Sequence, residues 1–356
     1  MKGDPILNSV FENSTNSYKY FWWLAIMELV IEKDQRTITF DDIVIKMITK
    51  MWYPINYFKL SFGKQDQIVN YTTELKKEFQ LDDNITEKKL QSFLRKEVDN
   101  KTINRISQKI TKYVPYRFIR PWFSLETMGL KDHLVNGSIL NIQNTKKDHT
   151  PYIIDSNNRL IILNSEIKKM IQTNYGILES FTLFKLTQFL EKRNSNIPNI
   201  SIKLSKPNSR SLNKATKIWK GFITLNPGIT DIFECKKLNK IENLSIDHFL
   251  PWSYFSHDEI WNTHPIDRSA NSSKNNRLPS KDYLVKFAKL QYIFLQHIIA
   301  IGNPELLVQY CNLLKVNKNE LLNLSIENFK LKFNEAYLQH FEIAVNMGFD
   351  KEWKFN

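Results

Sequence analysis

One polar stretch of the chain combines side chains that could bind a divalent ion with a histidine that could accept a proton. Asp247 directly precedes His248, Asn262 follows the histidine by fourteen residues, and Asn271 follows nine residues later. Lys274 stands three residues beyond Asn271. A carboxylate and an amide supply the hard oxygen ligands that Mg²⁺ prefers, and so small a set leaves coordination positions for water and phosphate oxygens. A neutral imidazole beside such an ion can take a proton from water. The pattern therefore predicts metal-assisted hydrolysis of a phosphate ester.

The spacing of these residues resembles that of the HNH, or ββα-metal, nucleases, in which a two-stranded hairpin and a helix surround one divalent ion. It is similar to the HNH domain of the RNA-guided CRISPR nuclease, including the proline at Pro251 and the closing Leu278–Ser280. This resemblance implies a Mg²⁺-dependent endonuclease that hydrolyses DNA and accepts Mn²⁺ as a substitute.

The resemblance also implies a role for each residue of the motif. Asp247 and Asn271 would bind the metal, and His248 would be the general base. Asn262 would hold the base in place by hydrogen bonding across the loop. Lys274, one helical turn beyond Asn271, would point the same way and contact a phosphate.

The complete series of residues carries this interpretation, because an Asp-His dipeptide occurs three times in the chain. The fourteenth residues after His133 and His149 are Lys147 and Leu163, and only His248 is followed by the Asn, Asn and Lys series. The alternative is a polar loop in an Asn-rich protein, where matches arise by chance. The agreement of residue types and spacings favours the nuclease.

The cysteines argue against the structural zinc that many HNH proteins hold with Cys-x-x-Cys pairs. The chain contains only Cys235 and Cys311, and Ile232 stands where a partner of Cys235 would be. Two distant thiols cannot form a four-cysteine site. We therefore expect no structural zinc.

The sequence does not distinguish DNA from RNA as the substrate, because hydrolysis of either polymer uses the same phosphate and metal chemistry. One alternative is an RNase of the same fold. Another is a non-catalytic nucleic-acid-binding subunit, which would require a missing ligand or base. A single ββα-metal module cuts one strand, so double-strand cleavage would require a dimer or two nicks.

The rest of the chain is similar to bacterial proteins in which an HNH module follows a long helical region. The shared features are S-Y-K-Y-F-W-W from Ser17 and Y-V-P-Y-R-F from Tyr113. This wider resemblance implies a role in restriction or antiviral defence, together with a protein partner or activator.

A second signal is a basic stretch without any acidic residue over residues 192–230. It holds eight Lys and Arg residues of a chain whose net charge is +13. Such a segment predicts phosphate binding, and the alternative is a solvated face. The predicted phosphate contacts are Lys203, Lys206, Arg210 and Lys214.

Some residues fit more than one role. Arg117 and Arg120 suit a buried arginine clamp and a nucleic-acid contact equally well. His257, Asp258 and His264 lie within the motif and could reach a metal or phosphate, but we expect surface or loop-capping roles for them.

Local patterns predict a mainly helical α+β protein with an embedded ββα-metal module. The segment 17–32 is apolar on nearly every face, which is typical of a buried helix. Thr39 begins a helix through Trp52, and Pro54 should end it. Further helices are expected over 87–113, 165–193, 281–300, 304–316 and 325–346, and a hairpin over 152–163.

These elements suggest a helical domain at 1–135, a mixed basic segment at 136–230, the HNH module at 231–285 and C-terminal helices at 286–356. The longest apolar run, Tyr20–Met27, is far shorter than the roughly twenty residues that cross a bilayer. We therefore expect no membrane partner and a cytoplasmic location.

Overall fold

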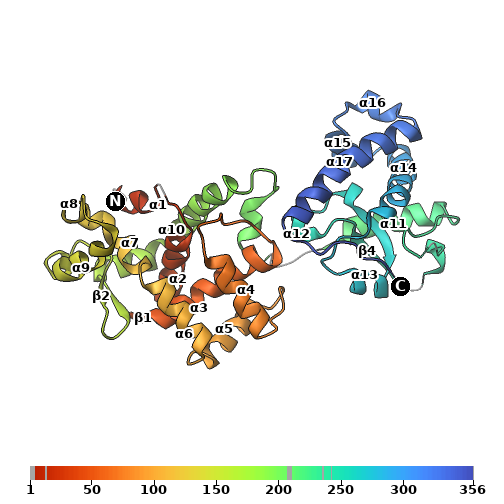
Figure 1. Ribbon diagram of the computed structural model, residues 1–356. Coiled ribbons are helices and arrows are strands. Elements are labelled where there is room, and N and C mark those ends of the chain that lie inside the picture. Colours follow the sequence, from red (N-terminus) through yellow and green to blue (C-terminus); the bar gives the residue numbers. More distant parts are fainter. Residues whose placement is uncertain (1–4, 13, 207–210, 235, 242, 356) are drawn as a thin grey trace. The chain divides into compact units, whose positions relative to one another are not determined.

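The computed structural model describes residues 5–12, 14–206, 211–234, 236–241 and 243–355. The chain divides into two compact units (Figure 1). Unit 1 comprises residues 1–195 and 200–206, and unit 2 comprises residues 196–199 and 207–356. Both are mainly helical with small sheets, which confirms the predicted fold class.

Unit 1 packs helices around a three-stranded antiparallel sheet with the order β1-β3-β2. Its elements are α1 (Pro5–Phe11), α2 (Tyr18–Lys33), β1 (Thr37–Thr39), α3 (Phe40–Trp52), η1 (Tyr53–Tyr57), α4 (Ile68–Glu78), α5 (Glu87–Lys96), α6 (Lys101–Thr111), α7 (Val114–Ile119), η2 (Arg120–Phe123), α8 (Ser124–Thr127), α9 (Asp132–Ile142), η3 (Gln143–Lys146), β2 (Tyr152–Asp155), β3 (Leu160–Leu163), α10 (Ser165–Glu191) and η4 (Ile200–Leu204).

The buried helix and the hairpin predicted for this unit are confirmed and lie in one core. Trp22 of α2 donates from Nε1 to the hydroxyl of Tyr152 at 2.9 Å, and that hydroxyl donates to the carbonyl of Pro115 at 2.7 Å. The strand β1, which we did not predict, pairs with β3. These contacts tie the start of the chain to residues 152–163, and the predicted boundary after residue 135 falls inside α9.

The helix predicted from Thr39 through Trp52 is confirmed as α3, and the π-helical η1 continues the chain past Pro54. One helix prediction needs correction. The single helix expected over 87–113 is two helices, α5 and α6. The side chain of Asn100 accepts from the Thr102 N–H at 2.8 Å and starts a new helix there.

Unit 2 contains a two-stranded hairpin of β4 and β5 surrounded by helices. Its elements are α11 (Asn213–Leu225), η5 (Leu238–Lys240), β4 (Leu244–His248), α12 (Trp252–Phe255), η6 (Ile260–Asn262), β5 (Thr263–Asp267), α13 (Arg268–Lys274), η7 (Lys281–Tyr283), α14 (Leu284–Ile301), α15 (Pro304–Leu314), α16 (Lys318–Leu322) and α17 (Ile326–Asn346).

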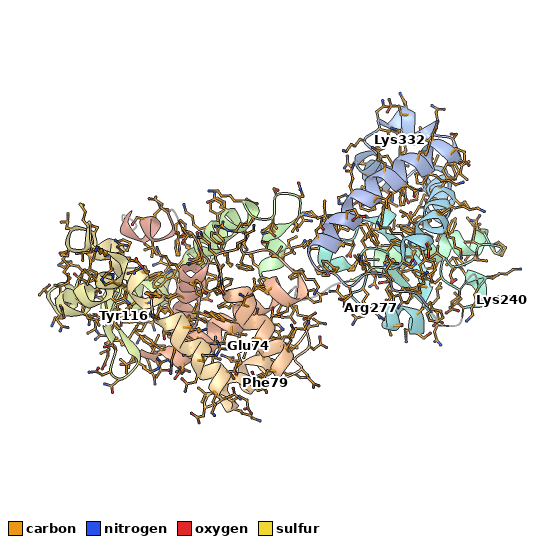
Figure 2. The ribbon with its side chains drawn as sticks, in the orientation of Figure 1. Glu74, Phe79, Tyr116, Lys240, Arg277 and Lys332 are labelled. Atoms are coloured by element: carbon orange, nitrogen blue, oxygen red, sulfur yellow. The ribbon has the colours of Figure 1, made fainter. Side chains whose placement is uncertain are left out.

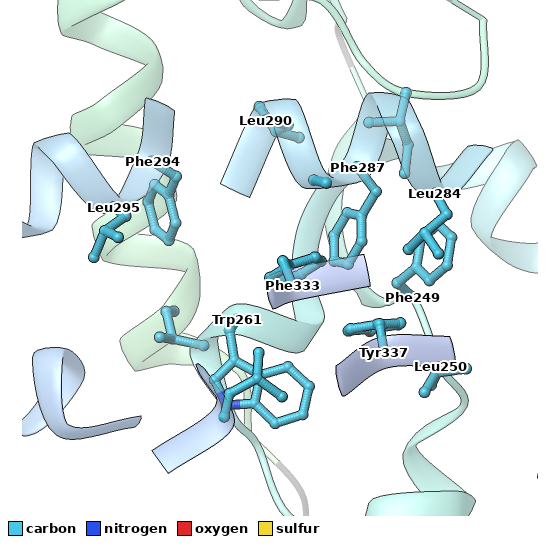
Figure 3. Packing of buried hydrophobic residues seen from close by; sticks show 14 of the residues in the cluster. Phe249, Leu250, Trp261, Leu284, Phe287, Leu290, Phe294, Leu295, Phe333 and Tyr337 are labelled. Atoms are coloured by element: carbon cyan, nitrogen blue, oxygen red, sulfur yellow. The ribbon is translucent and has the colours of Figure 1, made fainter. Parts of the chain in front are cut away.

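Aromatic side chains join the hairpin of unit 2 to its C-terminal helices (Figure 3). Phe249, directly after β4, stacks on Phe287 of α14 with ring centroids 4.3 Å apart, and Tyr337 of α17 lies edge-on to both rings. By length and composition, residues 281–301 would suffice to cross a membrane. Their apolar side chains pack in this core, which accounts for the hydrophobicity of α14.

Candidate active site

The hairpin and the short helix α13 place the motif residues against one another. β4 and β5 pair so that Asp247 lies opposite His264. The chain then turns into α13, whose N-cap Asp267 accepts from the Ser269 N–H at 2.8 Å. The short connection between β5 and α13 returns the helix to β4. This is the order of elements expected for a ββα-metal module.

Two contacts fix α13 on β4. Asn271 donates from its amide nitrogen to Ser245 Oγ at 3.2 Å, and Lys274 donates to Asp247 Oδ2 at 2.9 Å. Residues two apart on a strand share a face, as do residues three apart on a helix. Asp247 and Asn271 therefore lie at one strand–helix interface.

The donor atoms at this interface fit a hard divalent cation. The amide nitrogen of Asn271 is used by Ser245, which leaves the amide oxygen for a ligand. Oδ2 of Asp247 receives Lys274, and Oδ1 accepts no hydrogen bond from the described residues. One carboxylate and one amide oxygen suit Mg²⁺ or Mn²⁺ and leave room for water and phosphate.

Lys274 was predicted to contact a phosphate, but its side chain does not reach the surface of unit 2. Its side chain is completely buried, and its ammonium donates to Asp247 and to the carbonyl of His248 at 2.7 Å. Burial raises the pKa of Asp247, but the charge and hydrogen bond of Lys274, together with the imidazoles of His264 and His248, outweigh burial and hold that pKa below its ordinary value. Lys274 is thus an internal counter-charge that keeps Asp247 ionised.

His248 is buried with 1% exposure, and its ring nitrogens form no hydrogen bond with the described residues. Nε2 lies 2.9 Å from Oδ1 of Asp258, although the two groups are not in hydrogen-bonding alignment. A buried polar group without a hydrogen bond is costly and is often found at a functional site. The ring is therefore available to accept a proton, with a carboxylate beside it.

Asn262 holds the backbone that follows His248. Its side chain accepts from the N–H of Leu250 and donates to the carbonyl of the same residue, both at 3.0 Å. The hydroxyl of Tyr337 also donates to the Asn262 amide oxygen. Tyr337 lies far along the chain on α17, so the spacing of the motif carries no signal for it.

The comparison with known protein families covers this part of unit 2. Residues 231–280 match the model of the HNH endonuclease family. This segment is an HNH endonuclease domain. No curated protein and no solved structure matches the chain. The match supports a nuclease acting on nucleic acid.

HNH nucleases typically use a divalent metal. The described residues contain no group of three or more His, Cys, Asp or Glu side chains that could hold one. The pair of Asp247 and Asn271 is not such a group, because the side chain of Asn271 is an amide. Cys235 lies outside the described residues, and burial raises the pKa of Cys311, which disfavours the metal-binding thiolate. The absence of structural zinc stays a prediction.

His264 does not have the surface or loop-capping role that we expected, whereas Asp258 is exposed, as expected for a surface residue. His264 is completely buried on the HNH hairpin among the rings of Phe233, Phe249 and Phe287. Burial lowers its pKa to about 4. The imidazole is therefore neutral at physiological pH, and Asp258 lies against His248 as described above.

The neutral state of His264 should make the stability of unit 2 depend on pH. Its pKa is lower in the folded chain than its ordinary value of 6.5, so the unfolded chain takes up the proton first as the pH falls. The stabilisation is complete above pH 6.5 and should be lost toward pH 4, by about 3 kcal/mol. Denaturation at several pH values should show a weaker acid dependence for His264→Phe than for the wild type. Identical pH dependences would contradict this assignment.

The residues of the basic stretch are divided between the two units, and one of the predicted contacts is buried. Lys203 is completely buried in unit 1, where burial lowers its pKa to about 7, so it is not the predicted phosphate contact. The ammonium of Lys206 lies 5.5 Å from the ring centre of Tyr53 in the same unit. Lys214 belongs to unit 2 and pairs with Glu305 at 2.7 Å. Arg210 lies outside the described residues.

A basic cavity beside α13 is a feature that the sequence did not reveal. It has a volume of about 480 Å³, and its lining holds three basic residues and one acidic residue among seven: Ser273, Arg277, Lys351, Glu352, Trp353, Lys354 and Phe355. Backbone hydrogen bonds from Leu278 and Ser280 join the end of the motif to the C-terminal segment. These lysines are remote from the motif in sequence, and only the folded chain brings them to it.

Proposed function

We propose that the HNH domain hydrolyses phosphodiester bonds of DNA with Mg²⁺, for which Mn²⁺ can substitute. The observation that carries this proposal is the β4–α13 interface, where Asn271 and Lys274 of α13 donate to Ser245 and Asp247 of β4, and where the buried His248 directly follows Asp247. A bound ion would stabilise negative charge on the phosphate and on the leaving oxygen.

The side chains around this interface divide the work of hydrolysis. His248 accepts a proton from water, whose oxygen attacks phosphorus while the bond to the 3′ oxygen breaks. The products carry a 5′-phosphate and a 3′-hydroxyl. Asn262 holds the loop that aims the imidazole, and Lys274 keeps Asp247 ionised before the metal binds. The carboxylate of Asp258 lies beside this imidazole, with Oδ1 2.9 Å from Nε2.

The basic cavity beside α13 supports binding of a nucleic-acid backbone. Arg277 is exposed at this edge of unit 2, whereas Lys332 lies at its opposite end (Figure 2). Arginine and lysine side chains bind phosphates without regard to base sequence. We assign the phosphate contacts of the HNH domain to Arg277 and Lys351.

Neutralising these two residues should flatten the salt dependence of DNA binding. For Arg277→Gln with Lys351→Gln, the log–log slope against salt should decrease by about 0.9 for each lost duplex contact. The matched control is Lys318→Gln with Lys332→Gln, which removes the same charge from exposed positions. Binding should be measured in EDTA to prevent cleavage. Equal slopes for both double variants would contradict the assignment.

Cleavage of matched DNA and RNA substrates tests the proposed function. The wild-type chain should cleave DNA in Mg²⁺, should leave 5′-phosphate ends and should be inactive in EDTA. Cleavage of RNA but not DNA would show that the domain is an RNase and not a DNA endonuclease. The implied role in restriction or defence, with its partner or activator, stays a prediction.

A further inference from the structure

Unit 1 contains a basic cavity that the nuclease reaction does not use. Its volume is about 600 Å³, and it lies where the beginning of α2 meets α4, α6 and α7. A second cavity of about 330 Å³ shares Lys19, Arg117 and Arg120 with it. We propose that this pair of cavities binds a phosphorylated nucleotide through these three cations.

The charges around the cavity are poorly balanced. Asp132 is the only acidic residue in its lining. Five basic side chains line it: Lys19, Lys109, Lys112, Arg117 and Arg120. Arg117 pairs with Asp132 at 2.8 Å, and no carboxylate among the described residues forms an ion pair with the other four. Such a cluster attracts an anion, because cations held close together raise the local potential.

Lys19 shows how closely the cations approach one another. It is partly buried and donates to the carbonyl of Val10 at 3.0 Å. Burial, followed by the charges of Arg120 and Arg117, lowers the pKa of its ammonium. Arg120 makes only long contacts with Thr127, both at 3.4 Å, so its guanidinium retains donors for a ligand. A phosphate monoester between these side chains, with a charge of about −2, would offset most of their uncompensated positive charge.

Aromatic rings in the same cavity select a nucleotide over a bare anion. Tyr113 is 42% exposed, and the cationic groups of Lys112 and Arg117 lie 5.1 and 5.7 Å from its ring centre. Tyr18 and Tyr71 also line the cavity. Tyrosine rings stack on bases while arginine and lysine bind phosphate. The volume matches sites for small ligands, so one or two nucleotides fit better than a duplex.

Calorimetric titration of the full-length chain in EDTA tests the proposal without using nuclease activity. The probes are ATP, a deoxyadenylate trimer with a 5′-phosphate, the same trimer with a 5′-hydroxyl, and inorganic phosphate. Binding of ATP alone identifies a free nucleotide, and binding of the phosphorylated trimer but not the hydroxyl trimer identifies a strand terminus. Either result supports the proposal. No binding of any probe at millimolar concentration and low salt would overturn it, as would binding of inorganic phosphate alone.

Variants assign the binding to this cavity. Lys19→Gln with Arg120→Gln should weaken nucleotide binding by about tenfold or more, since each removes a charge-assisted contact. The control Lys88→Gln with Lys89→Gln removes the same charge from exposed positions on α5 and should bind like the wild type. Tyr113→Ala, which removes an exposed ring, should weaken the binding of nucleotides but not the binding of inorganic phosphate. Wild-type nucleotide affinity in Tyr113→Ala, or in a folded Lys19→Gln and Arg120→Gln protein, would overturn the proposal.

Discussion

Replacing His248 by Ala should reduce cleavage by on the order of 10²–10⁴-fold, the usual effect of removing a general base. Neither proposed metal ligand is changed, so binding of Mg²⁺ and of DNA should remain close to wild type. Nicking of supercoiled plasmid under single-turnover conditions measures the first effect. Calorimetric titration with the ion measures the second.

His257→Ala is the matched control for this variant. His257 lies in the segment between β4 and β5, is partly exposed, and has Nδ1 3.3 Å from Oε1 of Glu259. It should cleave at nearly the wild-type rate. A His248→Ala protein that cuts as fast as the wild type, in a preparation free of host nuclease, would refute the role of His248 as the base.

Replacing Asp247 by Asn should have two separable effects. The ion should bind more weakly, so cleavage should require higher concentrations of Mg²⁺ or Mn²⁺. The ammonium of Lys274 should also lose its only charged partner among the described residues inside unit 2. Leaving a buried charge unpaired should cost about 3–5 kcal/mol of unfolding free energy.

A double variant distinguishes these effects. Asp247→Asn with Lys274→Met removes both buried charges, so the unfolding free energy should recover while the metal requirement stays high. Asn271→Ala should raise the metal requirement with little change in stability, since among the described residues the Asn271 side chain hydrogen-bonds only to Ser245, at 3.2 Å. Asn262→Ala should reduce cleavage in a way that added metal does not restore. Full recovery of metal affinity in the double variant would show that Asp247 is not a ligand.

The spacing of the motif predicted which chain segments come together at the site, but it did not predict the environment of each side chain there. Asp247, Asn262 and Asn271 could be placed because one hairpin and one following helix fix their separation. The burial of Lys274 and His264 could not be predicted, because it depends on packing with distant residues. Polar residue types in a short motif give no indication of that packing.

The same distinction holds for the fold. The helix α2 was predictable because it is apolar on nearly every face, and α10 because its pattern is long. The three-residue strand β1 is too short for a pattern, and it exists through its pairing with β3. That pairing joins the first predicted domain to residues 136–195 of the second, whereas residues 211–230 of the second predicted domain lie in unit 2.

Anomalous diffraction from crystals soaked in Mn²⁺ tests the proposed metal site most directly. The account predicts an ordered Mn²⁺ bound by the carboxylate of Asp247 and the amide oxygen of Asn271, with the remaining positions held by water or phosphate. The same soak of Asp247→Asn crystals should show a much weaker peak. No Mn²⁺ peak at this interface at saturating concentration, or an ordered ion bound by other residues while cleavage proceeds, would contradict it.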